Sequence, residues 1–81
     1  MQKKEEIWVL TTVDDQQVLG EKAVVSIHRS LTTALRELMV DLNEVMVHRN
    51  LNDSDIEGDV ESLYLQTRDR MNCWFIESKE V

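Results

Sequence analysis

Proline is absent from this sequence of 81 residues, and glycine occurs only twice, at Gly20 and Gly58. Disordered segments and flexible linkers are rich in turn-forming and polar residues, so this scarcity argues against both. We therefore predict a single folded domain spanning residues 1–81. A chain of this size buries only roughly 60–65% of the surface that its unfolded form exposes, so its own core is small.

Basic residues are few: nine Lys and Arg stand against 16 Asp and Glu, which gives a formal net charge of −7. Proteins that grip nucleic acid need clustered Lys and Arg against the phosphates, so direct nucleic-acid binding is not expected. Acidic charge keeps a sticky domain soluble, and it could also imitate nucleic acid on a basic partner.

Long hydrophobic runs are also missing, and cysteine occurs once, at Cys73. The charged start of the chain leads into a short apolar run that Asp14 ends, which predicts neither a signal peptide nor a membrane span. A single cysteine permits no disulfide within the chain, so we expect a reducing, cytoplasmic location. Cys73 lies in an apolar stretch and is predicted to be a small buried hydrophobe.

Three β-rich segments have apolar residues on both faces: Ile7–Val13, Ala23–His28 and Cys73–Ser78. Side chains alternate along a strand, so a sheet with one wet face should alternate apolar and polar residues. These segments do not. The pattern predicts that a partner covers the face that the chain's own helices leave open. The first two segments are expected to form a hairpin, joined through Asp14–Gly20.

A helix is predicted after Ser30, which is a suitable N-cap. Apolar residues then recur at steps of three and four, and His48 and Arg49 fall in a last turn that ends near Asn50. The stripe consists of Leu31, Leu35, Leu38, Leu42, Val45 and Met46.

A second helix is predicted from Ser54, because Ser54 and Glu57 have the spacing of a capping box. Gly58 weakens its second turn, and Asn72 could close it. Its apolar face would consist of Ile56, Val60, Leu63, Tyr64, Thr67 and Met71.

These elements predict an α+β fold in the order β-β-α-α-β. A three-stranded sheet, made of the hairpin plus a C-terminal strand, would carry two antiparallel helices on one face. We expect Ile7–Val13 in the centre, with the last strand parallel to it. The predicted core includes Leu35, Leu38, Leu42, Val60 and Leu63.

The acidic residues from Asp53 to Glu61 resemble the start of a calcium-binding loop, with Gly58 at the sixth position. The twelfth position is Tyr64, which cannot supply the bidentate carboxylate that such a loop needs. His28, His48 and Cys73 fall on three separate elements and have no metal-binding spacing. We therefore expect no metal, no cofactor and no catalytic residue, and we predict that the chain is not an enzyme.

Four residues are candidates for an interface: Trp8, Trp74, Val40 and Val47. Val40 and Val47 are seven residues apart, so they share a side of the first helix, away from Leu35. The tryptophans are core residues by default, although tryptophan is enriched in binding hot spots. A tryptophan facing away from the helices would be the stronger candidate.

The sequence thus predicts a non-catalytic protein-interaction module that is a homodimer, with one apolar sheet face or edge buried against a copy of itself. The alternative is a small acidic inhibitor, or nucleic-acid mimic, that occupies a basic surface on a partner protein. If the segment Asp14–Gly20 and the chain ends instead fold over the second sheet face, the chain would be monomeric.

Overall fold

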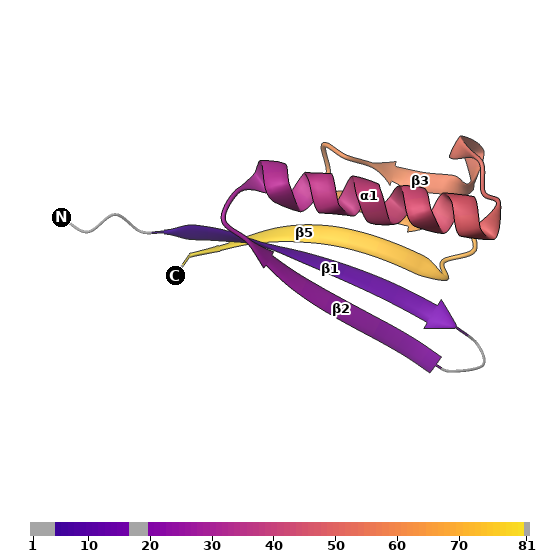
Figure 1. The fold of residues 1–81 in the computed structure, drawn as a ribbon, viewed down its shortest axis with the longest axis horizontal. Coiled ribbons are helices and arrows are strands. Elements are labelled where there is room, and N and C mark those ends of the chain that lie inside the picture. Colours follow the sequence, from indigo (N-terminus) through magenta and orange to yellow (C-terminus); the bar gives the residue numbers. More distant parts are fainter. Residues whose placement is uncertain (1–4, 17–19, 81) are drawn as a thin grey trace.

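Five strands form one antiparallel sheet in the described part of the chain, residues 5–16 and 20–80 of the computed structural model. The strand order is β2-β1-β5-β4-β3, and the helix α1 lies along one face (Figure 1). The elements are β1 (Glu6–Gln16), β2 (Gly20–His28), α1 (Leu31–Arg49), the short 3-10 helix η1 (Asp53–Asp55), β3 (Ile56–Asp59), β4 (Tyr64–Thr67) and β5 (Asn72–Glu80).

The hairpin and the first helix are confirmed. β1 pairs antiparallel with β2, with Trp8 opposite His28. The predicted connection Asp14–Gly20 is shorter than expected because β1 continues to Gln16, and residues 17–19 lie outside the described residues. At the start of α1, Ser30 Oγ accepts a hydrogen bond from the backbone N–H of Thr33 at 3.2 Å. Asn50 ends the helix in the left-handed conformation, a common helix terminus.

The predicted second helix is wrong. Its residues form the hairpin of β3 and β4, so the predicted three-stranded sheet with two helices is replaced by five strands and α1 in the described chain. Gly58 has a φ of 94°, and Leu63 has a φ of 58°, values that an α-helix excludes. A Cβ added at Gly58 would lie 2.4 Å from the carbonyl oxygen of Tyr64, so this close strand approach requires glycine.

Ser54 does not cap a helix, so the predicted capping box of Ser54 and Glu57 is wrong. The exchange of hydrogen bonds occurs two residues earlier, between Asn52 and Asp55. The backbone N–H of Asn52 donates to Asp55 Oδ2 at 2.8 Å, and the backbone N–H of Asp55 donates to the Asn52 carbonyl at 2.9 Å. These bonds stabilise only the short turn η1, after which the chain becomes extended at Ile56.

The last strand runs antiparallel to β1, not parallel as predicted. A second antiparallel helix would have returned the chain to the end of the sheet where β1 begins, and the last strand would then have run parallel to β1. A hairpin instead starts and ends at the same end of the sheet, as the backbone bond from Arg68 N–H to the Asp55 carbonyl shows. β5 therefore begins opposite Asp14, with Asn72, and ends opposite Glu6.

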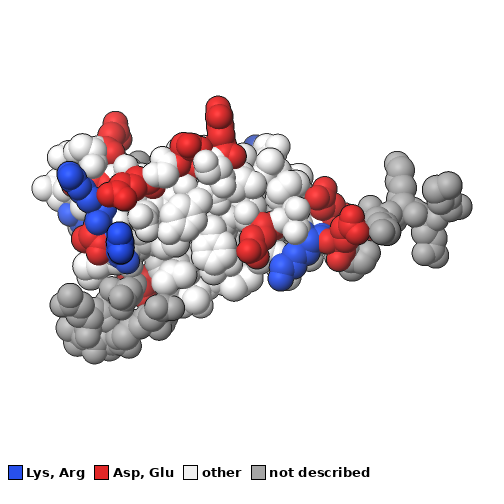
Figure 2. All heavy atoms as spheres, turned by 180° about the vertical axis from the view of Figure 1, so that it is seen from behind, with Lys and Arg blue, Asp and Glu red and all other residues white. Residues whose placement is uncertain are grey.

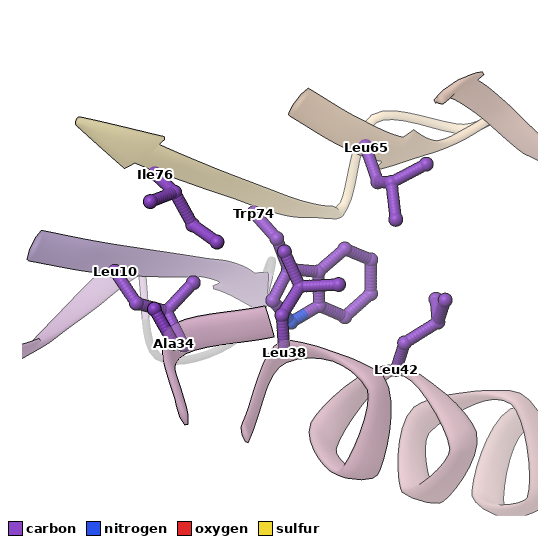
Figure 3. Close-up of a cluster of buried hydrophobic side chains, with 7 residues drawn as sticks. All are labelled: Leu10, Ala34, Leu38, Leu42, Leu65, Trp74 and Ile76. Atoms are coloured by element: carbon purple, nitrogen blue, oxygen red, sulfur yellow. The ribbon is translucent and has the colours of Figure 1, made fainter. Parts of the chain in front are cut away.

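The core lies between α1 and one face of the sheet (Figure 3). Of the predicted core residues, Leu38 and Leu42 are buried, whereas Leu35 and Leu63 are half-buried at its margin. Val60 is exposed in the turn after β3, because that segment is not helical. The buried apolar residues are Leu10, Ala34, Leu38, Leu42, Leu65, Trp74 and Ile76.

Candidate interaction surface

Both tryptophans lie on the face of the sheet that α1 covers. Trp74 of β5 is completely buried, with 0% exposure, and its indole Nε1 donates to Asp41 Oδ2 of α1 at 2.6 Å. Trp8 of β1 is half-buried and packs against the core. The structure therefore places neither tryptophan on an uncovered surface, although both were candidates for an interface.

The opposite side of the sheet, here called the open face, has no element packed against it among the described residues. Uncharged side chains fill its middle, and charged side chains lie around them (Figure 2). This is the side seen from behind in Figure 1. The alternation of side chains assigns to the open face Ile7, Val9, Thr11, Val13, Ala23, Val25, Ile27, Tyr64, Gln66, Cys73 and Phe75. It also assigns to this face the charged residues Glu57, Asp59, Glu77 and Lys79.

The open face changes character from β2 to β3. Towards β3, polar groups bond to one another: Tyr64 Oη donates to Gln66 Oε1 at 3.0 Å, and Gln66 Nε2 donates to Glu57 Oε2 at 3.2 Å. A hydrogen bond with the neighbouring Cys73 thiol raises the pKa of the Tyr64 hydroxyl above its ordinary value. Towards β2, the exposed side chains Val25 and Ile27 are purely apolar.

Exposed apolar side chains also gather on the helix side of β2, which α1 leaves partly uncovered. Val24 and Val40 line one hollow of about 280 Å³ between β2 and α1, together with Ser26 and Glu37. We call the outer margin of β2, with Val24, Val25, Ile27 and the adjacent Val40, the β2 edge. Their exposed fractions are 62, 58, 67 and 55%, so water reaches apolar groups on both sides of one strand.

Of the two candidate helix residues, the structure brings only Val40 to the β2 edge. Val47 lies seven residues further along α1, is 74% exposed, and is absent from the lining of the hollow. The sequence pattern did indicate the other residues of the β2 edge, which were not named as candidates, because Ala23–His28 is apolar on both faces. It did not indicate that this strand lies at the margin of the sheet.

The two margins of the sheet differ strongly. β3 is only four residues long, contains Gly58 with its positive φ, and carries Glu57 and Asp59. Short length, charge and backbone irregularity are features that protect edge strands from pairing with other chains. β2 is nine residues long, and Ala23–Ile27 contains no charged residue. The β2 edge thus lacks these protections along its middle.

A second hollow, of about 380 Å³, lies at the C-terminal end of α1, and Arg49 in its wall already has partners. Arg49 donates to Asn72 Oδ1 at 2.6 Å and forms an ion pair with Asp69. That arginine is the first cause of the lowered pKa of Asp69, about 2 instead of 3.8, and bonds from Thr67 and the backbone of Met71 add to it. Through this hydrogen bond and this ion pair, Arg49 connects the end of α1 to the turn before β5 and to the first residue of β5.

The candidate metal and catalytic residues remain apart or have local partners. His28 Nε2 lies 2.9 Å from both Ser26 Oγ and Glu37 Oε2, which connects the end of β2 to α1. His48 lines the hollow at the other end of α1, and Cys73 is half-buried on the open face. Within residues 5–16 and 20–80, no three His, Cys, Asp or Glu side chains gather in a metal-binding arrangement.

Comparisons with protein-family models, with curated proteins and with solved structures gave no match for this chain. In the part of the chain that the structure describes, no helix combines the length and apolar character needed to cross a membrane.

Proposed function

We propose that this chain is a non-catalytic protein-interaction module that works as a homodimer. The observation that carries the proposal is the uncovered apolar surface of the sheet, which extends over the open face and around the β2 edge. α1 buries one face only, and the described residues contain no second α-helix to cover the other. Large continuous apolar patches are rare on monomers and are typical of interaction sites.

A second copy is an economical partner, because a two-fold interface uses the same patch on both molecules. Burial of apolar surface contributes roughly 25 cal/mol per Å² before the costs of association. The net charge of −7 opposes the approach of two copies, but the segment Ala23–Ile27 of β2 carries no charged residue. The contact therefore excludes like charges from its centre.

The alternative of an acidic inhibitor has less support, because Asp55, Glu57 and Asp59 have structural partners. Asp55 accepts a backbone hydrogen bond in η1, Glu57 accepts from Gln66, and Asp59 Oδ1 accepts from the backbone N–H of Ser62 at 2.6 Å. These carboxylates stabilise turns and strand pairing, which explains their presence without a basic partner. Binding to a nucleic-acid-handling protein with steep salt dependence would favour the inhibitor instead.

Sedimentation equilibrium at micromolar concentration tests the homodimer. We expect a species of twice the 9.5 kDa chain mass for the unaltered protein. Val25→Lys should shift the equilibrium to monomer, because a charge would be buried in the contact. Val60→Lys is the matched control, since Val60 is also exposed but lies in the turn after β3. A single 9.5 kDa species for the unaltered chain would refute the proposal.

A further inference from the structure

We infer that two copies of this chain join through their β2 edges, in antiparallel register, to form one continuous sheet of ten strands. This inference rests on the proposed homodimer and specifies its contact. The partner is a second copy, and the joining groups are the backbone N–H and C=O groups on the outer side of β2 together with the apolar side chains beside them.

The distribution of exposed apolar residues favours the edge over the open face as the contact. A face-to-face dimer would cover Val25 and Ile27 but would leave Val24 and Val40 in water, because they lie on the helix side. Edge pairing covers side chains on both sides of β2 at once. It also leaves the hydrogen-bonded polar groups near β3, such as Tyr64 and Gln66, undisturbed.

Symmetry restricts the register of the paired strands. Directly opposite residues in an antiparallel pair have side chains on the same face, so the two-fold axis must pass midway between the two copies of one β2 residue. An axis at Val25 places Val24 opposite Ser26 of the second copy, and Ala23 opposite its Ile27. The same register pairs the uncharged segment Ala23–Ile27 entirely with itself.

An axis at Val24 would instead pair only Ala23–Val25 with itself, so Ser26 and Ile27 would lie outside the self-paired part of the uncharged segment. The register centred on Val25 is therefore the one we assign. The two uncharged segments match in this register. The dimer is also closed, because pairing uses the β2 edge of both copies. The remaining margins are both β3, which is short and charged, so the sheet stops at ten strands.

Disulfide trapping tests the register directly, in a Cys73→Ser background that removes the native thiol. A Val25→Cys change puts two cysteines opposite each other at the axis, where Cα atoms are about 4.5–5.5 Å apart. Disulfides need Cα separations below about 7 Å, so this variant should form a covalent dimer under mild oxidation. Ile27→Cys is the control, because its two copies would lie about 13 Å apart along the strands.

Lysine substitutions separate this inference from the proposed function. Val24→Lys should convert the dimer to monomer, because Val24 lies at the edge on the helix side. Tyr64→Lys should leave the dimer intact, because Tyr64 lies on the open face far from β2. Circular dichroism checks that both variants keep the unaltered fold.

The outcomes distinguish two failures. A dimer that survives Val24→Lys and dissociates with Tyr64→Lys would overturn edge pairing while leaving the homodimer in place. A dimer in which Ile27→Cys links as readily as Val25→Cys would overturn the assigned register. An unaltered chain that is monomeric would overturn both the inference and the proposed function.

Discussion

The indole N–H of Trp74 points at the carboxylate of Asp41, with 2.6 Å between Nε1 and Oδ2. Trp74 is the largest completely buried side chain among the described residues, and this bond satisfies its polar atom where α1 crosses β5. The pair therefore determines how α1 is placed on the sheet. Val40, which precedes Asp41 on α1, lines the hollow beside β2 together with Asp41.

Removing the acceptor should destabilise the fold. Asp41→Ala leaves a buried N–H without a partner, which costs about 1–3 kcal/mol in the free energy of unfolding. Asp41→Asn keeps an oxygen acceptor and should lose less. Urea unfolding followed by tryptophan fluorescence measures both variants, and Glu44→Ala, an exposed acidic residue on the same helix, is the control. Equal stability of Asp41→Ala and the unaltered chain would contradict this role of Asp41.

Leu38 should be among the most sensitive positions of the core. It is 1% exposed and lies between α1 and the sheet. Leu38→Ala is expected to cost about 2–5 kcal/mol, because apolar contacts are lost and a cavity remains. Met39→Ala, at the next and more exposed position of α1, should change stability far less. A cost below about 0.5 kcal/mol for Leu38→Ala would mean that α1 presents another face to the sheet.

Gly58 should tolerate no side chain. Gly58→Ala requires an L-residue at a φ of 94° and places a Cβ against the backbone of Tyr64. We expect a loss of more than about 1 kcal/mol and weakened pairing of β3 with β4. Hydrogen exchange of the β3 and β4 amides measures this local effect. Glu61→Ala, in the exposed turn of the same hairpin, is the comparison and should leave the exchange rates unchanged.

Asp69 should make stability depend on acid pH. Its pKa is lowered from 3.8 to about 2, first by Arg49, so the folded state favours the carboxylate. A lowered pKa gives stability that is present above about pH 4 and is lost as pH falls towards 2. Because Asp69 is largely exposed, solvent screening limits this contribution to about 1 kcal/mol. Asp69→Asn should be less stable than the unaltered chain at pH 7, and the two should converge near pH 2.

The segment 54–71 shows where sequence reasoning failed. Ile56, Val60, Leu63, Tyr64 and Thr67 fit the period of a helix, but Leu65 and Thr67 also fit the alternation of a strand. The strand prevails because Leu65 lies opposite Trp74 in the sheet and both are buried against α1. This pairing joins residues distant in sequence, so no local pattern could have selected it. Gly58 was read as a weak point in a helix, whereas its positive φ serves the hairpin of β3 and β4.

The sequence indicated an apolar candidate surface, but it did not indicate where that surface lies on the sheet. Apolar residues on both faces of Ala23–His28 indicated an uncovered surface, and Val40 was correctly expected on the outer side of its helix. Trp8 and Trp74 were placed among the interface candidates because tryptophan is common there, yet they fill the space under α1. Whether a strand is central or marginal depends on strand order, which no single segment encodes.

The sequence alone determined the elements whose signals are local. Ser30 and Asn50 mark the ends of α1, since their capping conformations depend only on neighbouring residues. β1, β2 and β5 followed from runs of β-branched and aromatic residues. Only the tertiary structure decided the hairpin of β3 and β4, the antiparallel direction of β5 and the marginal position of β2. Each of these depends on backbone pairing between distant segments, and the energy of that pairing is absent from any one segment alone.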